Sequence, residues 1–227
     1  MNRLYLFTLL FLYPFFSIGQ DTAAGKSLET RPGTEEMILS GVQFNNFSGL
    51  NGQLKAAGLA PLNAGMFSLG GGVAIRFRQL IIGADLTWLG GTQEAVYANG
   101  LSNTLYVSTN ALASGKWIFS PIVGIGSQDI HVRINQPGTA TSFVNALTGS
   151  YNQVELDHET IFLDLGMAFK IRWPGGRKNY IPIFKAGYRY GLEEDNAWSV
   201  RNNSAVADGP RDRVSSFYLN LLVAFVQ

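Results

Sequence analysis

The sequence predicts an all-β fold, an eight-stranded antiparallel up-and-down barrel that crosses a membrane, on the evidence of three observations. Residues 161–173 alternate strictly: every odd position is large and apolar, while Asp164, Lys170 and Arg172 occupy even positions. Similar alternation recurs along the chain, and the connections between the alternating stretches are by turns short and long. Successive side chains of a strand point to opposite faces, so 161–173 has one wholly apolar face. A membrane barrel turns such a face to lipid and keeps the charges in its lumen.

The composition favours a lipid-facing surface and excludes several kinds of chemistry. Charged residues make up 15% of the chain, whereas an ordinary soluble domain has about 25%. With no cysteine, the chain has no disulfide, no thiol nucleophile, no cysteine-bound metal and no lipid attached through a lipoprotein cysteine. A formal net charge of +1 without a Lys/Arg cluster gives no electrostatic footprint for nucleic acid. We therefore expect no cofactor and no nucleic-acid partner.

The N-terminus predicts export. Arg3 is followed by an apolar run at 4–16 and then by small residues. This run is shorter than the roughly 20 apolar residues that a membrane-spanning helix needs. A retained N-terminal anchor is the alternative, against which Pro14 and the polar residues after the run argue. We expect a signal peptide at 1–19, a flexible periplasmic leader at 20–35 and the barrel at 36–227.

Eight segments have the length and pattern of strands. Those at 67–77 and 180–192 alternate apolar residues with small or charged ones, as 161–173 does. The two faces of 36–45 cannot be distinguished, and 104–113 is largely polar. The pattern of 117–134 shifts phase near Ser127, which indicates either a β-bulge or a stretch that rises clear of the membrane. The full set is 36–45, 67–77, 80–88, 104–113, 117–134, 161–173, 180–192 and 214–226.

The connections alternate in length. Short turns are expected at 78–79, 114–116 and 174–179, and long polar loops at 46–66, 90–103, 135–157 and 193–213. Short turns at one rim and long loops at the other are typical of outer-membrane barrels, in which the turns face the periplasm and the loops face the outside of the cell. An even number of strands then leaves both termini in the periplasm.

The first long loop predicts a helix. In 46–66, Leu50, Leu54 and Ala57 follow helical spacing after Ser48, a residue type that caps helix N-termini, and a glycine and a proline follow. We expect a short helix over the barrel mouth that packs on the rim, where it could also serve as a lid or a contact site.

The charged residues of the strands are expected to meet inside the barrel. Eight strands enclose only enough room for side chains to fill, so these groups should form a hydrogen-bonded ionic plug. A narrow conducting or ligand-binding lumen is the alternative. The inward charges are Arg76, Asp85, Asp164, Lys170, Arg172, Lys185 and Arg189. The aromatic residues expected at the membrane interfaces are Trp88, Trp173, Tyr180, Tyr188, Tyr190 and Phe225.

The sequence resembles the small eight-stranded outer-membrane barrels of Gram-negative bacteria, in particular the outer-membrane β-barrel proteins of Bacteroidota. The matching features are the export signal that ends Ser17-Ile18-Gly19-Gln20, the strand that contains Gly70-Gly71-Gly72, and the terminal strand 217–227. The resemblance implies a place in the outer membrane among lipid and lipopolysaccharide. It also implies insertion by the barrel-assembly machinery, which reads a terminal strand ending in an aromatic residue. Here Phe225 is followed by Val226 and Gln227, a departure from that pattern.

Few residues are available for catalysis or metal binding. His131 and His158 are the only histidines, and His158 with a loop serine such as Ser150 could form the Ser–His pair of a lipid hydrolase, although no nucleophile motif accompanies them. Asp129 with His131, or Asp157 with His158, could bind a metal weakly. The simpler interpretation, which we prefer, makes His158 a solvated loop histidine. We therefore predict no catalytic, cofactor or metal site.

We predict a non-enzymatic outer-membrane barrel that serves envelope structure, surface binding, or support of assembly or secretion. One alternative is an enzyme that modifies outer-membrane lipids. Another is a secreted soluble barrel that holds a small apolar ligand, as lipocalins do; Met167 and Phe169 would then lie inside and Lys170 outside. The long loops carry isolated aromatic residues that could bind an extracellular protein or glycan: Tyr97, Phe143, Tyr151 and Trp198.

Overall fold

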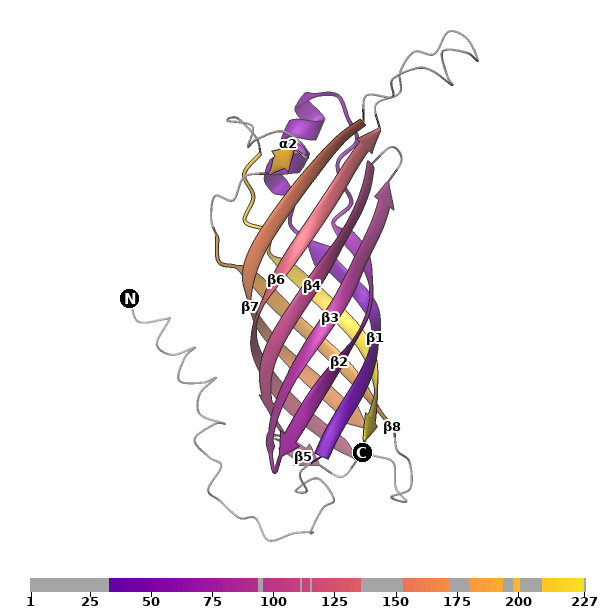
Figure 1. Ribbon diagram of the computed structural model, residues 1–227, viewed down its shortest axis with the longest axis vertical. Helices are drawn as coiled ribbons and strands as arrows, with labels where there is room; N and C mark the ends of the chain where they lie inside the picture. Colours follow the sequence, from indigo (N-terminus) through magenta and orange to yellow (C-terminus); the bar gives the residue numbers. More distant parts are fainter. Residues whose placement is uncertain are drawn as a thin grey trace, which may run out of the picture.

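The described strands close into a barrel, which confirms the predicted fold class. The computed structural model describes residues 33–93, 96–110, 112–114, 116–135, 153–171, 180–193, 198–200 and 210–226. Within these ranges, eight long antiparallel strands pair in the order β1-β2-β3-β4-β6-β7-β8-β10, and β10 pairs with β1 to complete the barrel (Figure 1). Two short strands extend the sheet, β5 at one end and β9 at the end that carries helix α2. We call these the β5 end and the α2 end.

The elements have the following bounds. The strands are β1 (Gly33–Asn45), β2 (Gly65–Phe77), β3 (Leu80–Gln93), β4 (Val96–Thr109), β5 (Leu112–Ser114), β6 (Trp117–Asn135), β7 (Gln153–Ile171), β8 (Tyr180–Gly191), β9 (Ser199–Val200) and β10 (Ser216–Val226), and the helix α2 covers Ser48–Ala56. In the described part of the chain, no helix is both long and apolar enough to cross a membrane.

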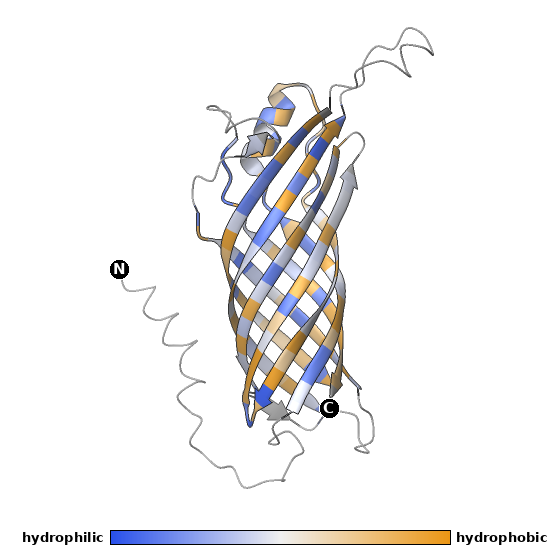
Figure 2. Ribbon diagram, viewed as in Figure 1, coloured by the Kyte–Doolittle hydropathy of each residue, from blue (hydrophilic) through white to orange (hydrophobic). Residues whose placement is uncertain are grey.

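Apolar side chains cover the outside of the barrel. Apolar and polar residues alternate along the strands (Figure 2), and the burial alternates with them: Leu221 is 50% exposed, whereas its neighbour Asn220 is 3% exposed. Met167 on β7 is 52% exposed and Lys170 only 6%. The lipocalin alternative requires the reverse, with Met167 inside and Lys170 outside, so the structure contradicts it.

The predicted long loop at 90–103 is wrong. β3 continues to Gln93, β4 begins at Val96, and the two strands pair without interruption up to these residues. Glycines and Asn99 give the segment the composition of a turn. In the barrel they extend the ladder instead, because Val96 and Ala98 are buried on its inner side.

Other strand boundaries also differ from the prediction. The signals that end a strand in sequence are weak where polar residues lie on the outer face, so several strands extend further than expected. β1 begins at Gly33 in place of 36, and β7 begins at Gln153 in place of 161. Two boundaries instead fall inside the predicted ones: β4 ends at Thr109 in place of 113, and β10 begins at Ser216 in place of 214.

β6 has no bulge in its ladder with β7. The register is continuous along the whole of β6, so the phase shift near Ser127 is not a change of backbone geometry. What changes is the chemistry of the two faces. Beyond Ser127, Ile130 and Val132 are buried on the inner face, while Asp129 and Arg133 lie exposed on the outer face. Toward the β5 end the outer face carries Trp117, Phe119 and Ile125, whereas toward the α2 end it is polar and the inner face is apolar.

An apolar core fills the α2 end of the barrel. The expected helix over the mouth is present, and its buried residues Leu50 and Leu54 contribute to this core. Inward side chains of β3, β4, β6 and β7 complete it. The core consists of Phe47, Leu50, Leu54, Leu62, Met66, Leu89, Val96, Ala98, Ile130, Val132, Ile134, Leu156, Trp198 and Val214.

Inward-facing glycines make room for large rings in the lumen. A Cβ on Gly187 would lie 2.5 Å from the Tyr218 hydroxyl, and a Cβ on Gly166 would lie 2.6 Å from it. Tyr218 is 1% exposed and therefore has little space into which it could move. These contacts explain why the strands need glycine at positions that point into a filled lumen.

We expect Gly187→Val to destabilise the barrel by about 3 kcal/mol, because it overpacks the lumen and separates Tyr218 from Asp164. Urea unfolding in lipid vesicles, followed by tryptophan fluorescence, measures the change. Gly52→Val in α2 is the matched control, since a Cβ there meets no atom within 4 Å. Equal unfolding midpoints for the two variants would contradict the packing role of Gly187.

Candidate functional site

The inner face of β1 passes through successive layers of the lumen. Starting at the β5 end, Glu35 lies in an ionic layer, Met37 and Leu39 in an apolar layer, and Gln43 and Asn45 in a second polar layer. None of these five residues is more than 6% exposed. The core at the α2 end then closes the barrel above them.

The first ionic layer is built on Glu35. Its carboxylate forms an ion pair with Arg76, and Lys170 Nζ lies 3.9 Å from Glu35 Oε2. Sequence analysis missed Glu35, because the residue falls in the segment 20–35 expected to be a flexible leader. The alternation of Glu35 with Met37 is the signal that identifies it. A carboxylate is needed here because two buried cations without a partner would be strongly unfavourable.

A second ion pair joins β3 and β8. Lys185 Nζ donates a hydrogen bond to Asp85 Oδ2 at 2.5 Å, and both side chains are buried. The ammonium of Lys185 also lies 4.3 Å from the centre of the Tyr106 ring, a cation–π contact. Gly83, on the strand next to Tyr106, leaves space for that ring.

Arg189 and Asp164 are opposite each other in the β7–β8 ladder, and both have neutral partners. Arg189 donates hydrogen bonds to Gln43 Oε1 at 2.8 Å and to Ser102 Oγ at 3.0 Å. Asp164 Oδ1 accepts a hydrogen bond from the Tyr218 hydroxyl at 3.0 Å. Sequence analysis missed these neutral partners, since a polar residue that alternates with apolar ones gives no sign of which partner it will meet across the barrel.

Six of the seven predicted lumen residues therefore have buried side chains inside the barrel: Arg76, Asp85, Asp164, Lys170, Lys185 and Arg189. The Tyr218 ring links three of them, since Lys185 and Arg189 lie 5.9 and 5.0 Å from its centre and its hydroxyl bonds Asp164. Arg172 lies outside the described residues. Side chains fill the described lumen closely, and a cavity between Lys170 and Lys185 measures about 20 Å³, which is room for about one water molecule.

Five of the six predicted interfacial aromatic residues lie on the outer surface. Those five are Trp88, Tyr180, Tyr188, Tyr190 and Phe225, and each is 39% to 50% exposed. Trp173 lies outside the described residues. Sequence analysis missed Trp117 at the β5 end, which is 42% exposed and stacks on Phe169 with 4.6 Å between ring centres.

Asp212 joins α2 and Trp198 at the mouth of the barrel. Its Oδ1 accepts a hydrogen bond from the Gly49 N–H at 2.6 Å, and its Oδ2 accepts from the Leu50 N–H at 2.9 Å and from the Trp198 indole N–H at 3.0 Å. A carboxylate at a helix N-terminus satisfies N–H groups that have no partner within the helix. Asp212 thus caps α2. The predicted cap, Ser48, is instead the first helical residue, so that prediction is wrong.

His158 is a buried residue of β7, so the prediction of a solvated loop histidine is wrong. It is 1% exposed, its ring centre lies 4.8 Å from that of Trp198, and its Nε2 donates a hydrogen bond to the Asp212 carbonyl at 3.3 Å. The prediction fails because β7 begins well before 161. Asp157 lies on the opposite face of the strand, so the two cannot share a metal ion. Ser150 lies outside the described residues.

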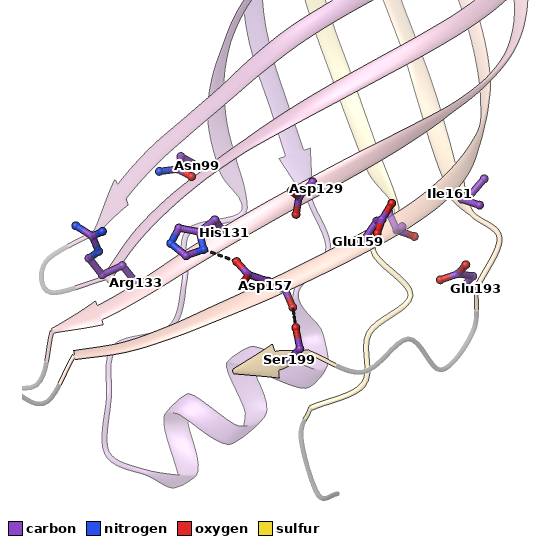
Figure 3. A pocket seen from close by; sticks show the side chains of 10 residues that line it. Asn99, Asp129, His131, Arg133, Asp157, Glu159, Ile161, Glu193 and Ser199 are labelled. Atoms are coloured by element: carbon purple, nitrogen blue, oxygen red, sulfur yellow. Dashed lines mark hydrogen bonds and ion pairs between the residues drawn. The ribbon is translucent and has the colours of Figure 1, made fainter. Parts of the chain in front are cut away.

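A groove of about 920 Å³ lies on the outer surface at the α2 end (Figure 3). The His131 ring is hydrogen-bonded to the Asp157 carboxylate across the β6–β7 ladder, and Arg133 Nη2 lies 3.1 Å from Glu155 Oε1. In the described ranges, no group of three or more His, Asp and Glu residues is placed to hold a metal ion. We call this the outer groove; it is lined by Asn99, Asp129, His131, Arg133, Asp157, Glu159, Thr160, Ile161, Glu193 and Ser199.

Comparison with known proteins identifies the fold. Neither a family model nor a curated protein matches the chain in sequence. Among solved structures, a major outer membrane protein from Thermus thermophilus is similar, with a TM-score of 0.52, 12% identity, and coverage of 86% of this chain and 99% of that one. Neisserial surface protein A is similar with a TM-score of 0.46, 13% identity and coverage of 86% and 96%.

A further similar structure is Ail, the attachment invasion locus protein of Yersinia pestis, with a TM-score of 0.46, 8% identity and coverage of 86% and 98%. Identities this low bear on the fold alone. Together with the closed eight-strand pairing, the likeness to the Thermus protein gives the chain the fold of the eight-stranded outer-membrane β-barrels.

Proposed function

We propose that the chain is an integral outer-membrane barrel with a closed lumen, whose α2 end faces the outside of the cell. Its role is non-enzymatic: it supports the envelope, presents a binding surface, or assists assembly or secretion. The observation that carries this proposal is the reversal of polarity along β6 on either side of Ser127.

The reversal has a simple physical reason in a membrane. A barrel wholly in water has no need of the exposed apolar belt at the β5 end. A barrel wholly within lipid could not carry Asp129 and Arg133 on its outer face, because a basic side chain at the bilayer midplane costs about 2–4 kcal/mol. A water–lipid boundary that crosses β6 near Ser127 satisfies both requirements. It puts the outer groove just outside the membrane.

We also propose how the protein reaches the outer membrane. A signal peptide at 1–19 would direct export, and the barrel-assembly machinery would insert the strands among outer-membrane lipid and lipopolysaccharide. The features that support membership of the Bacteroidota type are those of the sequence, namely the export signal and the terminal strand. The lipid-modifying alternative gains no support from His158, because Trp198 and Asp212 enclose its ring.

We expect the protein to pellet with envelopes, to resist carbonate extraction and to migrate differently on gels before and after boiling. In planar bilayers it should show no stable openings, because the lumen is closed by ion pairs and by the core under α2. Release into the soluble fraction would contradict the membrane location. Stable, reproducible conductance would leave the location intact and contradict the closed lumen.

A further inference from the structure

We infer that one water molecule is bound inside the barrel, between the ionic layer of Glu35 and the ion pair of Lys185 with Asp85. Its site is the cavity of about 20 Å³ that Ser108, Lys170 and Lys185 border. The water molecule joins the two ionic groups through hydrogen bonds. This deepens the proposed function, and rests on it in one respect, because the bound water is a part of the closed lumen.

The hydroxyl group of Ser108 is the first sign of a bound molecule. Ser108 lies on β4 and is 3% exposed, and its Oγ has no hydrogen-bond partner among the described residues. Two other buried serines of the lumen do have partners. Ser68 Oγ donates to Asn220 Oδ1 at 3.1 Å. Ser102 Oγ accepts from Arg189 at 3.0 Å. Buried hydroxyl groups nearly always have a partner, and for Ser108 a molecule in the adjoining cavity would supply it.

The cavity has the size and the polarity that a buried water molecule requires. Such a molecule needs a volume of about 10–15 Å³ and two to four polar partners. The volume here is about 20 Å³, and the polar residues Glu35, Ser108, Lys170 and Lys185 all border it. Cavities bordered by apolar side chains alone stay dry. Since apolar side chains form only the rest of this border, the cavity is suited to water.

Water matches these partners in its hydrogen-bonding capacity. It can accept a hydrogen bond from each of the two lysines and donate to the Ser108 hydroxyl and the Glu35 carboxylate. Lys170 Nζ lies 3.9 Å from Glu35 Oε2, and Lys185 Nζ lies 2.5 Å from Asp85 Oδ2. An ammonium group has three N–H donors, so a single ion pair does not use all of them. A water oxygen that accepts from both lysines also reduces the repulsion between their charges.

A neutral ligand suits this cavity better than an ion. Lys170 and Lys185 would repel a cation. An anion would meet the carboxylate of Glu35, which is 3% exposed and is already paired with Arg76. Water avoids both repulsions.

The first part of the test is a high-resolution crystal structure of the full chain. We expect electron density for one water molecule within hydrogen-bond distance of Ser108 Oγ and of at least one of the two lysine ammonium groups. A second crystal is soaked in a bromide salt, because bromide is an anion that anomalous scattering identifies.

The second part compares two serine variants in urea unfolding in lipid vesicles. Ser108→Ala removes one partner of the water molecule, so the equilibrium constant for unfolding should rise about fivefold. Without bound water, the same substitution would lower this constant, because it removes a buried hydroxyl that has no partner. Ser68→Ala is the matched control: it removes the direct hydrogen bond to Asn220 and should raise the constant by a similar factor. Each variant is first checked for the gel shift on boiling, so that only folded protein is compared.

A cavity without electron density, or a Ser108→Ala variant as stable as the unaltered protein or more stable, would overturn the inference. Bromide bound in the cavity would overturn it in favour of an anion site. Water at Ser108 together with stable conductance in planar bilayers would leave the water site intact and contradict the closed lumen. An empty cavity in a barrel that does not conduct would contradict the water site alone.

Discussion

Lys185→Met should destabilise the barrel by about 3–5 kcal/mol, because it leaves the Asp85 carboxylate buried without its cation. In the intact pair, Lys185 Nζ lies 2.5 Å from Asp85 Oδ2, and the two side chains are 4% and 2% exposed. Adding Asp85→Asn to this variant should recover most of the loss, since a neutral amide is far less costly to bury than a carboxylate. The free energy of unfolding, measured with urea in lipid vesicles, gives both values.

The exposed residue Asp129 supplies the control. Asp129→Asn also removes one carboxylate, but from the outer face, and the stability should stay within about 0.5 kcal/mol of that of the unaltered protein. If Lys185→Met and the double variant were equally unstable, the loss would come from side-chain packing. The ion pair would then have no special part in closing the lumen.

Asp212→Asn should release α2 from the mouth of the barrel while the strands stay folded. Asparagine keeps one acceptor oxygen and replaces the other with an amide group that has only donors, so the hydrogen bond from Gly49 to Oδ1 and the two from Leu50 and Trp198 to Oδ2 cannot all survive. Hydrogen bonds to a charged group contribute about 1.5–3 kcal/mol each, so the helix should lose about 3 kcal/mol of local stability.

Amide hydrogen exchange measures this change directly. In Asp212→Asn, the amides of α2 should exchange about 100-fold faster, which is the factor that corresponds to about 3 kcal/mol, and amides in the centre of β10 should be unaffected. Ser48→Ala should leave the exchange of α2 unchanged, because Asp212 rather than Ser48 caps the helix. Faster exchange in Ser48→Ala than in Asp212→Asn would contradict the capping seen in the structure.

The sequence could predict the strands whose outer face is apolar along their whole length. Along β2, β8 and β10 the outer face is apolar, and most inward residues are small, polar or charged, with exceptions such as Ile183, Tyr218 and Leu222. The period of two therefore identifies both the strands and their faces. Lys185 and Arg189 could be placed inside for this reason. Their partners could not be identified, because Asp85 and Gln43 lie about 100 residues or more away in the chain and only the closed ladder brings them together.

The predictions fail where the surroundings of a strand change. Near Ser127 the outer face of β6 changes from apolar to polar, and the sequence pattern leaves a bulge and a stretch clear of the membrane as alternatives. The continuous register with β7 excludes the bulge. In 90–103 and in the first residues of β7, polar residues lie on the outer face. The sequence pattern there predicts loops, although the structure has strands. Asp212 could not be predicted as a cap, since it follows α2 by more than 150 residues.

The lack of cysteine allows one direct test of which side chains face lipid. A nitroxide label attached to Leu221→Cys and, separately, to Asp129→Cys reports its collisions with oxygen, which concentrates in lipid, and with a water-soluble nickel chelate. In nanodiscs, the label at 221 should collide frequently with oxygen and rarely with nickel, and the label at 129 should show the opposite. A label at 221 as accessible to nickel as the one at 129 would contradict the membrane-spanning arrangement.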